Sequence, residues 1–409
     1  MSAITKTAKT DSKVSSRNHL EGRVPKLRFP GFEGAWKHRT MGVECSFFSG
    51  GTPNSTDAEL YNGTIPFIRS AEIDATETAL YLSEKGLTSS SSKLVEVGDL
   101  LLAMYGANSG DVAISKINGA INQAILCIRS ASLKTAFIKF YLERDKAKIT
   151  SKYLQGGQGN LSAEIIKELT FPFPQNNEQN KIINFIVTIE KRISAQRRLV
   201  ELLKKHKRGL INRLFKPSEH RGWKIVRLGD VGSFQKGAAL SKADISNDGR
   251  PFILYGELYT TYGEIIKDVV RRTIAEVDSS YLSRSGDVII PTSGETAEEI
   301  ATASCVMSDG VILGGDLNIY RSEHIDGRFL AYVIRYIISR DISRIAQGVS
   351  VVHISATELK RISVSIPPKD QQMRIVSVLE NYDDRITMAN EILKKMEAAK
   401  HGLLQQLFV

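Results

Sequence analysis

Apolar residues recur in alternating steps of four and three positions along two stretches of this 409-residue chain. This spacing places them on one face of a helix and is typical of a coiled coil. The first series is Ile182, Ile186, Ile189, Ile193, Gln196, Val200, Leu203, Lys207, Leu210 and Leu214. The second series is Ile375, Leu379, Tyr382, Ile386, Ala389, Leu393, Met396, Lys400, Leu403 and Leu407. We predict two helices, at residues 176–216 and 369–409, that pair through these seams, although the core helices of a four-helix bundle would show a similar pattern.

Three polar residues interrupt the seams: Gln196, Lys207 and Lys400. A polar side chain at a seam position fixes the register of a coiled coil and lowers its stability. We expect these three residues to act in that way.

The two helical stretches are copies of one another. Residues 161–216 align without a gap on residues 354–409, with 13 identities in 56 positions, where chance would give about 3 or 4 at ordinary residue frequencies. Shorter matches extend the repeat towards the N-terminus, among them Trp36 with Trp223 and the pair Gly98-Asp99 with Gly286-Asp287. Between these landmarks the two copies diverge. The chain therefore consists of two variable domains, each followed by a shared helix.

The variable domains, at residues 23–175 and 217–368, have the pattern of a mixed α/β fold. Short β-rich runs bounded by Gly, Asp and Ser predict strands, at residues 64–70, 98–106, 251–256 and 286–294. Apolar residues at helical spacing predict helices at 137–150 and 329–346. Residues 1–22 have the composition of a disordered tail.

Charge is distributed unevenly within the net charge of +10. Residues 177–216 carry 11 basic and 3 acidic side chains, and residues 1–30 carry 7 and 2, whereas both variable domains are close to neutral. The basic helix is either a solvated face or a surface beside a phosphate backbone or an acidic partner. If the variable domains bind nucleic acid, locally placed groups must do it.

The composition indicates a globular cytoplasmic protein. There is no apolar run of the ~18 residues that a membrane span needs, and the first residues lack the apolar part of a secretory signal. The three cysteines, Cys45, Cys127 and Cys305, are far apart and outside any metal-ligand spacing. They are expected to be reduced thiols.

Signatures of catalysis are missing from the sequence. No Gly-Lys pair occurs, so there is no phosphate-binding loop of the Gly-x-x-x-x-Gly-Lys kind, and neither His-Glu-x-x-His nor Cys-x-x-Cys is found. Asp99 and Asp287 are expected to close turns by accepting bonds from their own backbone, with a hydrolase carboxylate as the less favoured alternative. We expect no catalytic residue, no metal and no cofactor in this chain.

Two families of loops carry side chains suited to reading bases. They occupy residues 105–110 and 155–160 in the first copy, and 292–296 and 347–353 in the second. Asn, Gln, Ser and Thr offer donor and acceptor pairs that match base edges, and Gly lets the backbone come close, although the same composition is normal in an inert turn. The candidate base contacts are Tyr105, Asn108, Ser109, Gln158, Asn160, Tyr255, Thr292, Ser293, Ser350 and His353, and the candidate phosphate contacts are Arg69, Lys236, Arg197 and Arg198.

This ordered set of features resembles the specificity subunit of a type I restriction-modification system. No single motif is decisive, but the set covers nearly the whole chain after the tail. The motifs that carry the resemblance are the opening at 25–42, the Trp-Lys-x-x-x-Leu-Gly-Asp start at 223–230, the Gly-Asp strands, the Gln-Gly turns, the helix entry at 367–379 and the ending at 402–408.

The resemblance implies a function for each part. Each variable domain would be a target recognition domain that reads one half of a bipartite double-stranded DNA sequence, and the helices would pair antiparallel and set the spacer. A helix of about 36 residues spans ~54 Å, which is roughly one and a half turns of B-DNA. Two modification subunits would bind S-adenosylmethionine and methylate adenine after flipping it out of the duplex, and restriction subunits would use ATP and Mg²⁺. None of these cofactors would bind this chain.

Two other interpretations remain open at this point. The chain could be a scaffold that carries two interaction domains on a coiled-coil arm, but this does not explain why copies with preserved landmarks diverge in polar loops. A nuclease hidden in the variable domains is the other interpretation, and the lack of a repeated acidic or histidine cluster weighs against it. The basic first helix departs from the symmetry of the repeat, and contact with the phosphates of the spacer is our hypothesis for it.

Overall fold

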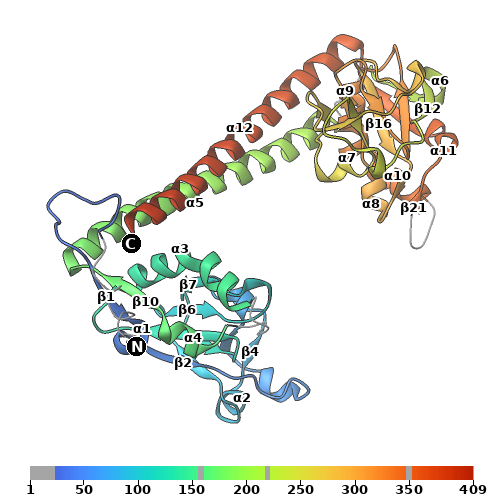
Figure 1. Cartoon of the computed structure of the whole chain (residues 1–409). Coiled ribbons are helices and arrows are strands. Elements are labelled where there is room, and N and C mark those ends of the chain that lie inside the picture. The colour runs from blue at the N-terminus through green and yellow to red at the C-terminus, as the bar shows by residue number, and fades with distance from the viewer. Residues whose placement is uncertain (1–23, 155–160, 217–221, 347–351, 409) are drawn as a thin grey trace, which may run out of the picture. The chain divides into compact units, whose positions relative to one another are not determined.

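The computed structural model describes residues 24–154, 161–216, 222–346 and 352–408, and Figure 1 shows its helices and strands. The chain divides into two compact units. The first unit contains residues 1–196 and 392–409, and the second contains residues 197–391. Each unit therefore takes a part of both long helices.

The long helices are α5 (Asn176–Leu214) and α12 (Lys369–Leu407), each of 39 residues. All twenty residues of the two predicted seams are buried or half-buried. In the second unit, Val200 and Leu203 of α5 pack with Ile386 and Ala389 of α12. The prediction of a mixed α/β chain with two long helices is confirmed.

The two helices pair antiparallel. In the first unit, Glu190 in the first half of α5 accepts a hydrogen bond from Lys400 near the end of α12. In the second unit, Lys207 near the end of α5 bonds to Asp383 in the first half of α12.

The globular part of the first unit is built on two sheets of short strands, the first antiparallel and the second mixed. Its sheets have the strand orders β2-β9-β6-β7 and β4-β3-β8-β5, with a separate pair β1-β10, and α3 packs against β6 and β7. The elements are β1 (Lys37–Thr40), α1 (Met41–Glu44), β2 (Ser46–Ser49), η1 (Ala58–Tyr61), β3 (Ile65–Ile68), η2 (Ser70–Glu72), β4 (Tyr81–Leu82), α2 (Glu84–Thr88), β5 (Lys93–Val95), β6 (Leu100–Ala103), η3 (Gly106–Asn108), β7 (Val112–Ile114), β8 (Gly119–Ile121), β9 (Ile125–Arg129), α3 (Thr135–Leu154), α4 (Ala163–Glu168) and β10 (Thr170–Phe173).

The globular part of the second unit repeats this plan. Its sheets have the orders β12-β20-β16-β18-β14 and β15-β13-β19, with the pairs β11-β22 and β17-β21, and α9 packs against β16 and β18. The elements are β11 (Lys224–Arg227), α6 (Leu228–Val231), β12 (Ser233–Lys236), η5 (Lys242–Asp244), β13 (Arg250–Ile253), α7 (Glu257–Thr260), β14 (Ile265–Ile266), β15 (Arg271–Thr273), η6 (Ser279–Tyr281), β16 (Asp287–Pro291), β17 (Ser293–Gly294), α8 (Ala297–Ile300), β18 (Ser304–Val306), β19 (Ile312–Leu313), β20 (Leu317–Arg321), α9 (Gly327–Tyr336), α10 (Ser339–Ile345), β21 (Val352–His353), α11 (Ala356–Lys360) and β22 (Ser363–Ile366).

Strands β6 and β16 lie at the centre of the two units and are buried along their whole length. Successive side chains of a strand point to opposite faces of the sheet. In β6, Leu100 and Leu102 join the core beneath α3, while Leu101 joins a second core on the other face. Both faces are therefore covered, which explains why this run is continuously apolar in the sequence.

The end of each long helix is anchored by a repeated aromatic cluster. Phe408 at the end of α12 packs with Trp36 and Phe137 of the first unit, with ring centroids 6.4 and 5.0 Å away. In the second unit, Trp223 lies 6.1 Å from both the Phe215 ring at the end of α5 and the Phe329 ring. The repeated tryptophans and phenylalanines of the sequence are thus explained by packing.

The repeated Gly-Asp pairs also have a structural role. Asp99 accepts a hydrogen bond from the Glu96 N–H at 2.8 Å, and Asp287 accepts one from the Arg284 N–H at 2.8 Å. These bonds close the turn before β6 and before β16, as the sequence predicts. Each carboxylate also binds an arginine of the neighbouring strand, Arg129 in the first unit and Arg321 in the second.

One predicted element is wrong in its extent. The helix expected at 329–346 is two helices, α9 and α10, because the backbone leaves the helical path at Ile337 and Ile338. Adjacent β-branched residues are stiff and reduce helix propensity. The break lets Ile338 and Ile342 enter the core. Among the described residues, no helix is long and apolar enough to cross a membrane.

Candidate nucleic-acid interface

The described residues of the two predicted loops of the second unit, at 292–296 and 352–353, lie side by side. Strand β17 pairs antiparallel with β21, and Ser293 stands opposite His353. The Ile354 N–H donates a hydrogen bond to the Thr292 carbonyl at 3.0 Å. Ser293 is buried and His353 is exposed. The fold therefore brings residues sixty positions apart into one surface, as a shared binding site requires.

Lys236 lies at the same edge of the central sheet. It pairs with Asn318 of β20, and Asn318 in turn pairs with Ile290 of β16, just before the loop at Thr292. The Thr292 N–H donates to the Asp316 carbonyl at 2.7 Å, and Asp316 adopts a positive φ of 58°. A left-handed residue here turns the chain sharply into β20. The exposed Lys236 can thus reach a phosphate beside the loop.

Tyr255 belongs to the same neighbourhood. It follows β13 and its ring centroid lies 6.4 Å from that of Tyr259 on α7. Burial raises the pKa of Tyr259 to about 12, and the nearby Tyr255, Glu299 and Glu295 add to the shift. Both glutamates belong to the segment that follows β17, and their charges act on the Tyr259 hydroxyl. The Tyr259 hydroxyl stays protonated at neutral pH, so it can both donate and accept.

The first unit contains the same backbone bond at the corresponding positions. The Leu161 N–H donates to the Met104 carbonyl at 3.0 Å, which matches the bond from Ile354 to Thr292 in the second unit. Tyr105 and Asn108 are half-buried at η3. Two of the candidates, Gln158 and Asn160, lie outside the described residues, as does Ser350 of the second unit.

Two candidates in the first unit are already bonded within the protein. Ser109 is buried and its hydroxyl donates to the Met104 carbonyl at 3.0 Å, which closes the turn. Arg69 binds Glu72 with two nitrogens, at 3.0 and 3.1 Å. It follows β3 directly, and η2, which begins at the next residue, packs on β6. A contact from Arg69 to DNA would have to compete with that carboxylate.

The basic side chains of α5 within the second unit lie on its solvent face. Arg197, Arg198, Lys204 and Lys205 are exposed, whereas Val200 and Leu203 on the seam are buried. Lys204 pairs with Glu201 at 3.0 Å. The four exposed basic side chains together form a basic stripe along this half of the helix.

Comparison with known families decides what kind of protein this is. Residues 35–204 and 220–398 match, as two copies, the model of the type I restriction modification DNA specificity domain. The chain belongs to this family. The resemblance seen in the sequence is therefore confirmed, and the chain is a DNA sequence-recognition protein of the type I restriction-modification class. Specificity subunits of such systems are not themselves catalytic, and they assemble with methyltransferase and restriction subunits.

Individual relatives agree with this assignment. The type I restriction enzyme MjaVIII specificity subunit of Methanocaldococcus jannaschii is 20% identical over 342 residues, which are 77% of this chain and 79% of that protein. The MjaIX specificity subunit of the same organism is 22% identical over 389 residues, 88% of this chain and 89% of that protein. The solved structure of a type I restriction-modification S subunit from M. genitalium matches with a TM-score of 0.59 at 17% identity, over 95% of this chain and 99% of that one. This last likeness supports the fold.

The structure adds two basic residues to this specificity chain's candidate interface. Arg340 and Arg344 are exposed on α10, beside a cleft of about 630 Å³ that Glu298 also lines. The Ser343 hydroxyl donates to the Ala297 carbonyl at 2.9 Å and holds α10 against α8, which follows the loop at Thr292. The spacing of four between the two arginines, on one face of a helix, was the available signal in the sequence.

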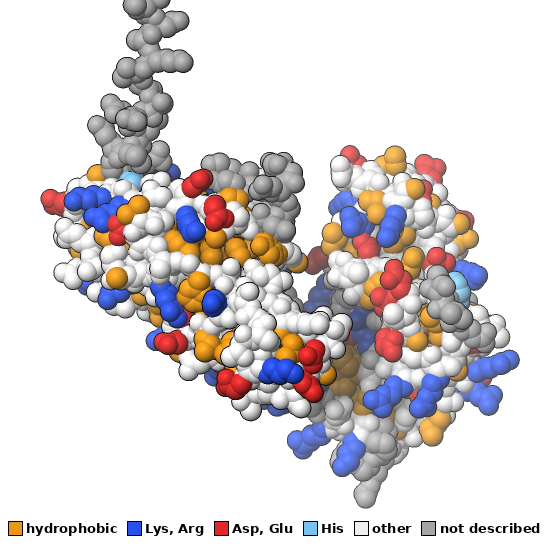
Figure 2. Space-filling view, turned by 90° about the horizontal axis from the view of Figure 1, so that it is seen from below, with side chains coloured by type: hydrophobic (Ala, Val, Ile, Leu, Met, Phe, Trp, Pro, Cys, Tyr) orange, Lys and Arg blue, Asp and Glu red, His pale blue; other side chains and the backbone are white. Residues whose placement is uncertain are grey.

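The charge of the recognition domains is local. In the face shown in Figure 2, acidic and basic side chains are interspersed over most of both globular parts, and Lys and Arg predominate at the lower right of the view. This agrees with the near-neutral charge of the two variable domains. Any DNA binding by the two variable domains would therefore depend on locally placed side chains.

The three cysteine thiols are protonated, as in structural residues. Burial raises the pKa of Cys45 to about 11 and that of Cys127 to about 12, and it also raises the pKa of Cys305. These thiols stay protonated and poorly nucleophilic at neutral pH. Within the described residues, no group of three or more His, Cys, Asp or Glu side chains could hold a metal ion.

Proposed function

We propose that each globular part reads one half of a bipartite double-stranded DNA target, and that the paired helices hold the two halves at one spacing. The observation that carries the proposal is the backbone bond that recurs beside the polar loops in both units, from Ile354 to Thr292 and from Leu161 to Met104. Residues that hold the scaffold repeat between the copies, while the loop residues differ. Two modules of one design with different reading surfaces suit a target with two different halves.

The proposed assembly includes two modification subunits. Leu199 on α5 and Ile392 on α12 occupy equivalent positions of the repeat, and both are exposed, by 44% and 48%. An apolar side chain exposed at the same place in both copies supports one docking site per copy. We expect S-adenosylmethionine to bind those subunits, ATP and Mg²⁺ to bind the restriction subunits, and none of the three to bind this chain.

Selection of DNA tests the proposal. The chain would be purified with its modification subunits and offered a pool of duplexes with a randomised segment. The expected result is enrichment of two short sequence elements separated by a spacer of constant length. The control is the same selection with the modification subunits alone, which are expected to enrich no sequence. Enrichment of no element, or of one continuous element, would contradict the proposal and favour a scaffold.

A further inference from the structure

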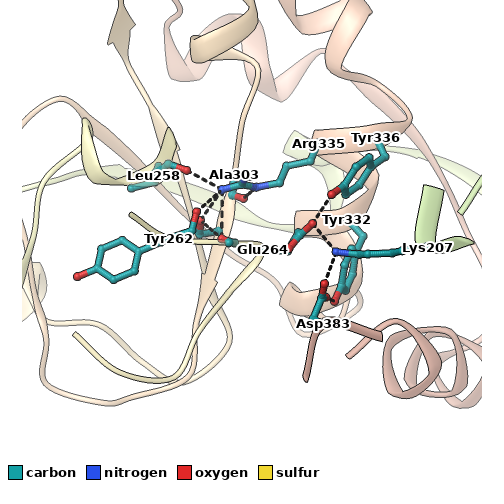
Figure 3. Close-up of polar contacts among 11 residues, drawn as sticks. Lys207, Leu258, Tyr262, Glu264, Ala303, Tyr332, Arg335, Tyr336 and Asp383 are labelled. Atoms are coloured by element: carbon teal, nitrogen blue, oxygen red, sulfur yellow. Dashed lines mark hydrogen bonds and ion pairs between the residues drawn. The ribbon is translucent and has the colours of Figure 1, made fainter. Parts of the chain in front are cut away.

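A buried lysine of α5 ties three parts of the second unit together (Figure 3). Lys207 is 6% exposed, and its ammonium donates to the Glu264 carboxylate at 2.7 Å and to the Asp383 carboxylate of α12. Tyr332 and Tyr336 of α9 donate their hydroxyls to Asp383 and Glu264. Burial raises the pKa of both tyrosines, so the hydroxyls keep the protons that they donate.

The first unit contains the counterpart of this tie. Lys400 of α12 donates to the Glu190 carboxylate of α5 at 2.7 Å and to the Glu143 carboxylate of α3 at 2.5 Å. Lys139 of α3 also donates to Glu190, at 2.6 Å. A lysine from one long helix thus binds a carboxylate of the other helix and a carboxylate of the recognition domain, in both units.

The helix residues of the two ties are equivalent, but the domain residues are not. Lys207 and Lys400 align in the repeat, and so do Asp383 and Glu190. The domain's carboxylate comes from the residue before β14 in the second unit, Glu264, and from α3 in the first, Glu143. The two domains have diverged around the tie and still supply an acid to it from different elements. A buried ammonium needs an anionic partner, and both domains supply one although they have diverged.

Both ties specify the same pairing of the helices. Lys207 lies as far beyond Glu190 on α5 as Lys400 lies beyond Asp383 on α12, so one antiparallel register satisfies both. A slip by one heptad moves one helix by ~10.5 Å along the other. In one direction the slip would place Lys207 opposite Val376 and Lys400 opposite Ile183, and neither is an acid. In the other direction Lys400 would face Arg197. A buried charge left without its partner strongly disfavours such states.

We propose that Lys207 and Lys400 are positioning residues which set the register of the helix pair and the seat of each recognition domain on it, and thereby the single spacer length that the chain accepts. Only the link from the helix register to the spacer length rests on the proposed function. The register itself is a property of the protein without DNA.

The test of the register uses two spin labels in the first unit of the full chain. Ser194→Cys on α5 and Ala398→Cys on α12 introduce thiols at exposed positions, in a Cys45→Ser background. Pulsed electron resonance without DNA then gives the distance distribution between the helices. We expect one narrow peak in this labelled chain, and a broadened or doubled distribution after Lys207→Met with Lys400→Met. An unchanged single peak in the methionine variant would overturn the proposal.

Matched variants separate the role of charge from that of length. Lys207→Arg with Lys400→Arg keeps the charge and is expected to keep the narrow peak. Lys394→Met, at an exposed lysine of α12, is the control and is expected to change nothing. If the methionine pair prevents folding, Glu190→Gln with Asp383→Asn removes the helix-to-helix half of both ties while the lysines keep Glu143 and Glu264. A broadened distance distribution in this variant would then support the proposal, and an unchanged single peak would overturn it.

The effect of the helix register on the accepted DNA spacer length is tested by a second measurement. With the modification subunits present, methylation would be followed on duplexes whose spacer is lengthened or shortened by single base pairs. We expect the methionine pair to raise the relative rate on shifted spacers by roughly tenfold, the scale on which one mismatched base pair weakens specific binding. Equal spacer discrimination in a chain with a broadened distance distribution would overturn this link. A chain that methylates no duplex at all would contradict the proposed function, while the distance measurement would still decide the register.

Discussion

Thr292, Ser293 and His353 come together because β17 and β21 pair, and Leu161 is held to Met104 by the equivalent backbone bond. At the scale of single residues, the repeat therefore separates two kinds of side chain. Those that recur, such as Asp287 and its equivalent Asp99, hold turns and strands. Those that differ between the copies lie at the loops, where different base edges can be read.

A change at His353 tests the reading edge. His353→Ala removes an exposed imidazole from the loop of the second unit. A good bidentate contact to a base edge is worth ~1–3 kcal/mol, so we expect affinity for the selected target to fall by roughly 5- to 150-fold. Discrimination at the half read by the first unit remains. Fluorescence anisotropy with single-base variants of each half measures both, and His324→Ala, at another exposed histidine of this unit, is the control. Unaltered affinity and discrimination would show that His353 reads no base.

A change at Asp287 tests the scaffold. This carboxylate is 2% exposed and binds Arg321 at 2.8 and 2.9 Å. Asp287→Ala leaves a half-buried guanidinium without its partner, and we expect the free energy of unfolding to drop by about 3 kcal/mol. Denaturant unfolding followed by circular dichroism measures the drop. Asp268→Ala, at an exposed aspartate, is expected to change it by less than about 0.5 kcal/mol. Equal effects of the two substitutions would argue against a scaffold role of the Asp287 pair.

At the scale of elements, the long helices and the central strands were predictable from the sequence. The seams follow a heptad, and β6 and the part of β16 after Asp287 are apolar runs because both faces of their sheets are covered. The pairs β1-β10 and β11-β22 were missed, since four-residue strands without a clear alternation join positions more than a hundred residues apart. The partners of Lys207 were also beyond prediction, because Glu264 precedes a two-residue strand and nothing local marks it.

The tie in the first unit makes stability depend on pH. Burial on its own would raise the pKa of Glu190, but the hydrogen bonds from Lys139 and Lys400 outweigh it and hold this pKa below its usual value. A depressed carboxyl pKa stabilises the fold above the unfolded value of about 4.3, and this stabilisation is lost as the pH falls through the folded value. We expect the difference in unfolding free energy between the natural chain and Glu190→Gln to be constant from about pH 5 to 7 and to shrink below about pH 4. Urea unfolding at several pH values measures it, and a difference independent of pH would contradict the role of the ion pairs.

The basic stripe of α5 is a property of a whole helix face. Reversal of Arg197, Arg198, Lys204 and Lys205 to Glu is expected to weaken binding to every duplex and to flatten the dependence of affinity on salt. The slope is expected to change by roughly 0.9 for each phosphate that the variant no longer neutralises. Titrations at several salt concentrations measure it, with Lys394→Glu and Lys395→Glu on α12 as the control. An unchanged slope would mean that the stripe faces solvent or a protein partner.

At the scale of the whole molecule, each unit is assembled from distant parts of the chain. Residues 392–409 complete the first unit, and the end of α5 is buried in the core of the second. The repeat in the sequence predicted two equal modules with two helices. It could not show that the end of each helix is seated in the other module, because Phe215 and Phe408 carry no mark of which core they enter.

The central claim is that this chain chooses a two-part DNA target for a methyltransferase. Mapping of methylated adenine across the genome of the source cell, with and without this gene, tests it most directly. We expect a methylated motif of two short elements with a constant spacer. It is methylated in both strands and is lost when the gene is removed. Restoring the gene with His353→Ala is predicted to relax one element and leave the other. A methylation pattern that survives removal of the gene unchanged, in cells whose modification subunits co-purify with this chain, would contradict the claim.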